Sequence, residues 1–123
     1  MKSKAISDPV FISACKRIEE LYGGIPFKER GITVSSELIK ATIEILNDET
    51  NKTLPQNCRN QTIEKTPYGL DYKIKERLNT NLRTANIISD ILHKAGIVTV
   101  IDVINPATGR NVKGTKLLQE WCW

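Results

Sequence analysis

Apolar residues recur at helical spacing in four segments of the chain. In the first segment they are Phe11, Cys15, Ile18, Leu21 and Tyr22. Asp8 as N-cap and Pro9 at the first helical position predict where this helix begins, and Gly23-Gly24 predicts where it ends. Three further helices are predicted, from Ser35 or Ser36 to about Asn47, from Gly69 to about Leu78, and from Leu82 to Ala95.

The second predicted helix is apolar over most of its surface. Its polar stripe consists only of Glu37, Lys40, Glu44 and Asn47. A helix with so wide an apolar face is expected either at the centre of the core or in a dimer interface.

The period of the pattern changes near the C-terminus. Residues 97–104 are mostly β-branched and predict a strand, 105–110 have turn chemistry, and 111–118 predict a partner strand that Gly114 would weaken. The segment 25–34 is predicted to be a connector. The polar stretch 48–68 predicts either a long loop or a short edge strand near Gln61–Glu64.

Composition and charge narrow the class of protein. With 123 residues, 40% of them apolar, the chain is expected to form a single domain over 1–123. The net charge of +4 is unevenly spread: residues 1–50 carry seven Lys or Arg and eight Asp or Glu, whereas 51–123 carry eleven and six. Any contact with a polyanion is therefore expected in the second part of the chain.

Cysteine usage and hydropathy predict a reduced, cytoplasmic protein without membrane contact. The three cysteines are far apart and odd in number, which argues against both a disulfide framework and a structural zinc site: Cys15, Cys58 and Cys122. The longest apolar run, 97–104, contains an aspartate and is too short to cross a bilayer.

Residues 69–118 combine a short helix, a break, a longer helix, an apolar strand, a turn and a basic strand. Within them, "LNTNLRTANIISDILHKAGIV" contains the break and the second helix, Gly96 closes that helix, and "TGRNVKGT" lies at a basic hairpin. On these residues the segment resembles the winged helix-turn-helix superfamily. The resemblance implies a mostly helical α+β fold whose C-terminal β-hairpin is the wing, with 1–50 as a helical core or dimerisation part.

The resemblance also implies three groups of DNA-binding residues, because such proteins place their second helix in the major groove and their hairpin along the backbone. The start and polar side of the second helix would contribute Thr80, Asn81, Arg83, Thr84, Asn86 and Ile87. The short helix would contribute phosphate contacts from Lys73, Lys75 and Arg77, and the hairpin would contribute Arg110, Asn111, Lys113 and Lys116. Asp90, on the same polar side, would oppose DNA.

We therefore predict sequence-specific binding of double-stranded DNA by a small transcriptional regulator or an accessory factor of a mobile element or defence system. The alternatives are a non-catalytic protein-interaction module with the same fold and the DNA-recognition subunit of a DNA-processing enzyme. No cofactor, metal ion or catalytic activity is predicted, because the lone histidine, His93, lies near a helix C-terminus, where an imidazolium is stabilised.

A homodimer is predicted through the N-terminal helices. Trp121 and Trp123 lie at the end of the chain, where two indoles either fold back onto the core or are buried in a partner subunit. Because many proteins that read DNA are two-fold dimers, these tryptophans are candidates for the same interface.

Overall fold

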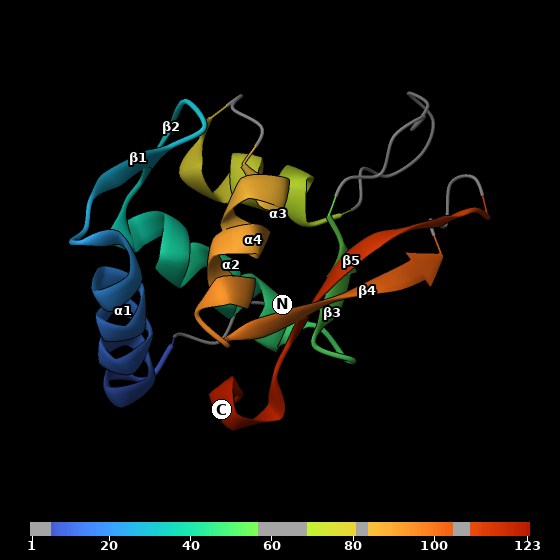
Figure 1. Ribbon diagram of the computed structural model, residues 1–123. Coiled ribbons are helices and arrows are strands. Elements are labelled where there is room, and N and C mark those ends of the chain that lie inside the picture. The colour runs from blue at the N-terminus through green and yellow to red at the C-terminus, as the bar shows by residue number, and fades with distance from the viewer. Residues whose placement is uncertain (1–5, 57–68, 81–83, 105–108) are drawn as a thin grey trace.

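The computed structural model describes residues 6–56, 69–80, 84–104 and 109–123, which form an α+β structure (Figure 1). Its described helices are α1 (Asp8–Tyr22), α2 (Ser36–Asp48), α3 (Leu70–Leu78), α4 (Ala85–Lys94) and the short 3-10 helix η1 (Gln119–Trp121). A two-stranded antiparallel sheet pairs β1 (Phe27–Glu29) with β2 (Ile32–Val34). A three-stranded antiparallel sheet has the order β3-β5-β4, formed by β3 (Thr53–Pro55), β4 (Val98–Ile104) and β5 (Asn111–Leu117).

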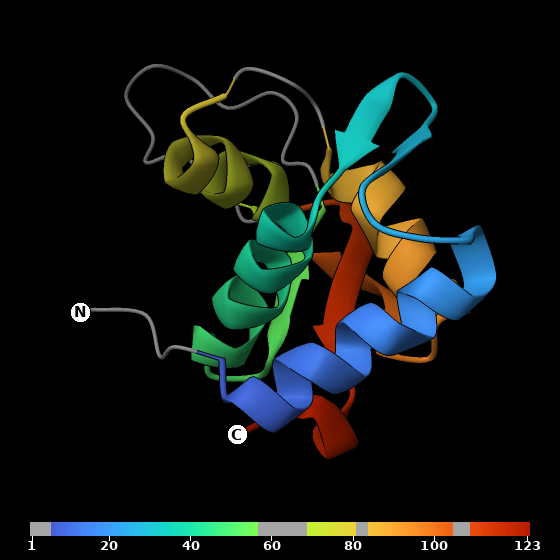
Figure 2. The same cartoon turned by 90° about the vertical axis from the view of Figure 1, so that its left-hand side faces the viewer.

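Helix α2 is the centre of the core. It contacts α1, α3, α4 and β5, and it lies between α3 and α4 in Figure 2. All residues from Ala41 to Asn47 are buried, so the prediction of a central helix is confirmed. The predicted polar stripe is wrong for Glu44 and Asn47, which are only 8% and 2% exposed because each has polar partners far along the chain.

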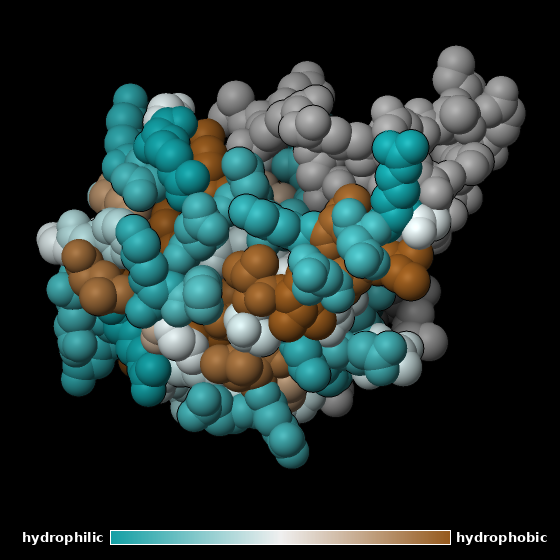
Figure 3. Space-filling view, turned by 45° about the vertical axis from the view of Figure 1, so that its right-hand side comes forward, coloured by the Kyte–Doolittle hydropathy of each residue, from teal (hydrophilic) through white to brown (hydrophobic). Residues whose placement is uncertain are grey.

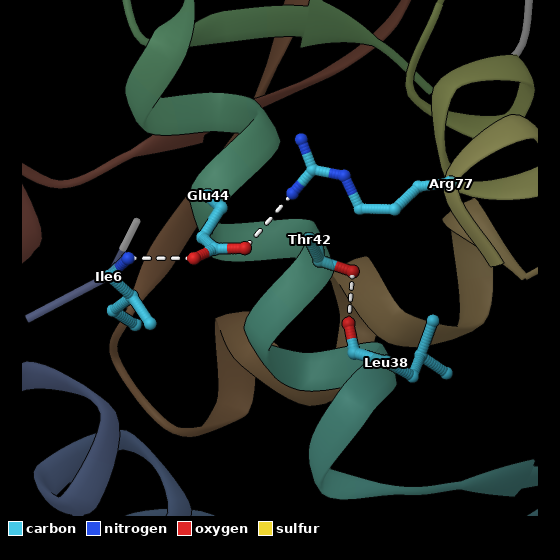
Figure 4. Close-up of polar contacts among 5 residues, drawn as sticks. All are labelled: Ile6, Leu38, Thr42, Glu44 and Arg77. Atoms are coloured by element: carbon cyan, nitrogen blue, oxygen red, sulfur yellow. Dashed lines mark hydrogen bonds and ion pairs between the residues drawn. The ribbon is translucent and has the colours of Figure 1, made fainter. Parts of the chain in front are cut away.

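The Glu44 carboxylate joins three parts of the chain (Figure 4). Its Oε2 accepts the backbone N–H of Ile6 at 2.7 Å, and its Oε1 accepts a hydrogen bond from Nη1 of Arg77 in α3 at 3.0 Å. Thr42, two residues earlier, is satisfied within α2, since its hydroxyl donates to the carbonyl of Leu38 at 2.8 Å. The buried polar groups of α2 shown there are therefore paired, as a buried carboxylate has to be.

Both C-terminal tryptophans fold back onto their own chain. The Trp121 ring is 6% exposed, its Nε1 donates to the carbonyl of Gly96 at 3.2 Å, and the guanidinium of Arg17 lies 5.2 Å from the ring centroid. The backbone of Trp123 exchanges two hydrogen bonds with the Asn47 side chain, at 3.1 and 3.3 Å. The tryptophans were expected either to fold back onto the core or to be buried in a partner subunit, and the structure has the first arrangement. The tryptophans therefore give no support to a dimer.

The helix ends follow local signals. The first helix ends where predicted, because Gly23 adopts a left-handed φ of 82° and its N–H returns to the carbonyl of Glu19 at 2.8 Å. Its N-cap is Ser7, not Asp8. Gly96, with φ of 75°, likewise follows α4 as predicted.

The predicted connector 25–34 is in fact a β-hairpin. Arg30 and Gly31, which join β1 to β2, have φ values of 48° and 85°. Positive φ at both central residues is the geometry of the tight two-residue turn that matches strand twist. The edge strand expected near Gln61–Glu64 falls outside the described residues, and the strand beside β5 is β3.

Gly114 fits β5 instead of weakening it. It lies opposite Ile101 of β4 and Pro55 of β3, and a Cβ atom at this position would lie 2.6 Å from Cγ1 of Val103. A β-branched valine has little freedom to turn away. The missing side chain is therefore what lets Val103 pack across the sheet.

Replacing Gly114 with alanine is expected to lower the free energy of unfolding by about 1–3 kcal/mol, as overpacking does elsewhere. The double variant Gly114→Ala/Val103→Ala removes the clash and is expected to recover most of that loss, with Val103→Ala alone as its reference. Urea unfolding followed by circular dichroism measures both. A Gly114→Ala variant as stable as the parent would contradict the close packing at this position.

Candidate nucleic-acid interface

A single carboxylate, that of Asp71, holds the corner between α3 and α4. Its Oδ1 accepts the backbone N–H of Thr84 at 3.1 Å and of Ala85 at 3.4 Å, the first amides of α4. Its Oδ2 lies 3.0 Å from Nζ of Lys75, and the residue is 6% exposed. The first N–H groups of a helix have no partner within it and stabilise negative charge. Asp71 therefore caps α4 from the preceding helix.

The polar side of α4 is exposed to solvent. Asn86, Asp90, His93 and Lys94 are exposed, and their spacing of three or four residues places them on one side of the helix. In Figure 1, α4 lies in front of α2, with the β1–β2 hairpin on its left and the β4–β5 hairpin on its right. This side of α4, together with the two flanking hairpins, is the candidate interface.

Two residues predicted to face a DNA groove do not reach the surface. Ile87 is 7% exposed and belongs to the hydrophobic core, and Thr84 is 5% exposed and stands at the N-cap position of α4. The helix begins at Ala85, three residues later than predicted, and packs against both α2 and β4. Its buried side is consequently wider than the sequence pattern indicated.

A buried pair of hydroxyls connects α4 to the sheet. Ser89 of α4 and Thr115 of β5 are both 0% exposed, and their oxygens lie 2.7 Å apart in a hydrogen bond. Two hydroxyls in the core satisfy each other in this way. The bond ties the helix of the candidate interface to a strand of the flanking hairpin.

The three cations predicted on α3 are each paired with a carboxylate. Lys73 lies 3.3 Å from Glu49 and Arg77 lies 3.0 Å from Glu44, and both carboxylates belong to α2 or its C-terminal cap. Lys75 is paired with Asp71, beside the start of α4. Of the three, Lys75 is therefore the one placed next to the candidate interface.

The β1–β2 hairpin contributes a cation that the sequence did not reveal. Nη2 of Arg30 forms a 2.8 Å ion pair with Oδ2 of Asp90, and both side chains are about half exposed. This pair neutralises the carboxylate that was expected to oppose DNA. A hollow of about 370 Å³ lies here, lined by Glu29, Arg30, Asp90, His93 and Lys94.

Tyr22 lies close to three of the residues that line this hollow, since Glu29, Arg30 and Asp90 all act on its pKa. Its ring stacks on Phe27 with centroids 4.5 Å apart, and its hydroxyl is buried without a hydrogen-bond partner among the described residues. Burial raises the pKa of the Tyr22 hydroxyl, Glu29 and Asp90 raise it further, and Arg30 opposes them. The hydroxyl therefore stays protonated and neutral beside the ion pair.

The residues predicted on the β4–β5 hairpin are all exposed. Arg110, Asn111 and Lys113 are exposed at its distal half. Lys116 is exposed as well, but it pairs in register with Thr53 and Thr99 and lies on the opposite face from Lys113. Its predicted contact with DNA remains a prediction, from the face of the hairpin opposite to Lys113.

The remaining predicted residues are only partly described. Thr80 is half-buried, and its N–H donates to the carbonyl of Lys75 at 3.0 Å. Asn81 and Arg83 lie outside the described residues. Their predicted contacts with phosphate and guanine remain predictions.

The described part of the chain has no group of three or more metal-ligating side chains and no helix long and apolar enough to span a membrane. Burial raises the pKa of the Cys15 thiol, and Glu19 raises it further, so this thiol is not an activated nucleophile. No protein-family model, curated protein or solved structure matches the chain.

Proposed function

We propose that this protein is a winged helix-turn-helix that binds double-stranded DNA with sequence preference, as a small regulator or accessory DNA-binding factor. The observation that carries the proposal is the exposed polar side of α4, held at a fixed corner by Asp71 and flanked by a hairpin on each side. The order α2, β3, α3, α4, β4, β5 and the sheet order β3-β5-β4 support the winged-helix assignment.

In this proposal, α4 enters the major groove, which is wide enough for a helix and displays a distinct pattern for each base pair. Asn86, in the first turn of α4, has the donor and acceptor pair that matches adenine. Lys113, which is exposed on one hairpin, would contact backbone phosphates beside the groove, and phosphate contacts fix register without reading sequence. Pairing with Arg30 keeps Asp90 from repelling those phosphates.

Fluorescence anisotropy with a random-sequence duplex tests the proposal, followed by selection of bound sequences from the same pool. Binding is expected to weaken steeply as salt is raised, because bound phosphates release counterions. Lys113→Ala is expected to weaken binding equally across sequences and to lower the salt slope by about 1. Asn86→Ala is expected to lose about 1–3 kcal/mol of discrimination at one base position.

Lys16→Ala is the matched control, since it removes one exposed charge from α1 and leaves the α4 side unchanged. If Lys16→Ala and Lys113→Ala weaken binding equally, the candidate interface is misplaced. Binding to duplex DNA without enrichment of any sequence in the selection would indicate an architectural role. No binding at low salt would refute the proposal and favour a protein-interaction module.

A further inference from the structure

The Arg30–Asp90 ion pair places an arginine of the β1–β2 hairpin on the exposed side of α4. Nη2 of Arg30 lies 2.8 Å from Oδ2 of Asp90, and both side chains are about half exposed. Asp90 is on the same side of α4 as Asn86, one turn further along the helix. The guanidinium therefore lies on the helix side that the proposed function assigns to the major groove, although Arg30 belongs to another element of the fold.

The hairpin that carries Arg30 is anchored in the core. Ile32 and Val34 of β2 are buried, and Phe27 of β1 packs against the same core. Arg30 is the first residue of the two-residue turn that joins these strands. The backbone of Arg30 is therefore held by the hairpin, and Asp90 holds the other end of its side chain.

Most of the hydrogen-bonding capacity of Arg30 is unused within the described part of the chain. A guanidinium has five N–H donors, and Asp90 accepts only from Nη2. The ion pair also restricts the rotamers of a long side chain, which lowers the entropic cost of a further contact. An arginine that is oriented by a carboxylate and still has donors to offer is suited to a ligand with two neighbouring acceptors.

The charges around Arg30 favour a base edge over a phosphate as that ligand. The hollow beside the pair is lined by two carboxylates, Glu29 and Asp90, and by two cations, Arg30 and Lys94. With His93 neutral these charges cancel, so the hollow has no excess positive charge to attract a phosphate. Guanine presents two uncharged acceptors, O6 and N7, at its major-groove edge, and a bidentate arginine is the commonest specific contact to them.

The surface around the pair is polar. In the space-filling view of Figure 3, hydrophilic side chains cover most of the left side, toward which α4 has turned from its place in Figure 1. Interfaces with DNA are more polar than those between proteins. This surface therefore matches base edges and phosphates better than an apolar partner.

We propose that Arg30 reads a guanine in the major groove and that Asp90 is the positioning residue that holds its guanidinium toward the base. The inference rests on the proposed function, because it needs α4 in the groove. Asn86 and Asp90 are four residues apart, which is about 6 Å along the helix axis. Since base pairs are stacked about 3.4 Å apart, the guanine should lie within about two base pairs of the adenine assigned to Asn86.

Fluorescence anisotropy with the selected duplex, and with that duplex changed at one base pair at a time, tests the role of Arg30. Changing the guanine pair should weaken binding of the parent about tenfold, as expected for one bidentate contact. Arg30→Ala should lose this preference. Arg30→Lys should bind unrelated duplexes like the parent but prefer guanine less, because lysine keeps the charge without the planar fork. A duplex with 7-deazaguanine, which lacks N7, should weaken the parent and leave Arg30→Ala unaffected.

Asp90→Ala separates positioning from simple repulsion. A carboxylate that only repels phosphates would, when removed, tighten binding to every duplex equally and leave the guanine preference unchanged. For a positioning residue, the preference should instead fall at least about threefold while binding to unrelated duplexes stays equal or tightens. The double variant Arg30→Ala/Asp90→Ala should then show no less preference than Arg30→Ala alone.

The same hairpin provides matched controls. Lys28→Ala removes an exposed cation from β1, and Glu29→Ala removes the other carboxylate of the hollow. Both controls should keep the guanine preference of the parent. Because exposed ion pairs add little to stability, all these variants should stay folded, which circular dichroism checks.

The outcomes distinguish this inference from the proposed function. A selected motif whose base preferences are all unchanged in Arg30→Ala would overturn the inference and leave the proposed function standing. Equal weakening of Arg30→Ala on all sequences, with a lower salt slope, would overturn it as well, because Arg30 would then contact a phosphate. An unchanged guanine preference in Asp90→Ala would overturn the positioning role. A parent that binds no duplex at low salt would refute both proposals.

Discussion

Replacing Glu44 with alanine is expected to lower the free energy of unfolding by about 3 kcal/mol. Removing one member of a buried ion pair usually costs about 3–5 kcal/mol because the other charge is left uncompensated. The Arg77 side chain is 28% exposed, so water recovers part of that cost. The backbone N–H of Ile6 also loses its acceptor, which detaches the segment that precedes α1. Urea unfolding at pH 7, followed by circular dichroism, gives the value.

Glu37→Ala provides the matched control on the same helix. Glu37 is exposed in the first turn of α2, where the helix dipole stabilises it and no described residue pairs with it, so its loss is expected to cost less than about 1 kcal/mol. A double-mutant cycle with Arg77→Ala isolates the pair itself. Equal losses for Glu44→Ala and Glu37→Ala would show that the buried carboxylate contributes nothing to the core.

Asp71→Ala is expected to cost about 2–3 kcal/mol and to reduce DNA binding in addition. The substitution removes the acceptor for the Thr84 and Ala85 amides and leaves Lys75 without its carboxylate. Losing an ordinary N-cap costs about 0.5–2 kcal/mol, and hydrogen bonds to a charged group are worth more. Because the first turn of α4 is the part that would enter the groove, fraying there should weaken binding even where most molecules are folded.

Urea unfolding measures the loss of stability. Fluorescence anisotropy with duplex DNA, at a temperature well below the unfolding transition, measures the loss of binding separately. Asp71→Asn keeps an acceptor and should fall between the parent and Asp71→Ala. Glu76→Ala, on the exposed side of α3, removes a carboxylate that among the described residues accepts a hydrogen bond only from Tyr72, so it should change neither stability nor DNA binding much. A frayed α4 with unchanged DNA binding would argue against α4 as the reading helix.

Much of the secondary structure could be predicted because its signals are local. Glycine ended α1, asparagine ended α3, and the β-branched run formed β4. The β1–β2 hairpin was missed because each strand has three residues, too few to show a period. Its one signal was Gly31, which follows Arg30 at a two-residue turn.

The buried polar residues could not be predicted because their partners are remote. Glu44 bonds to a residue 38 positions away, Asn47 to one 76 positions away, and Asp71 to the start of the next helix. No sequence pattern within a helix distinguishes these buried polar residues from the residues of a solvent-exposed polar stripe. The opposite faces of Lys113 and Lys116, by contrast, could be predicted, because a spacing of three places two residues on opposite faces of any strand.

The hydroxyl pair between Ser89 and Thr115 has a consequence for how a duplex would be accommodated. Together with the packing of α4 on β4, it holds the helix against the strands of the hairpin. The protein then has little room to adjust, and the duplex must match the spacing of helix and hairpin through its own groove width. Stiff and pliable DNA sequences would be distinguished in this way at base pairs that no side chain touches.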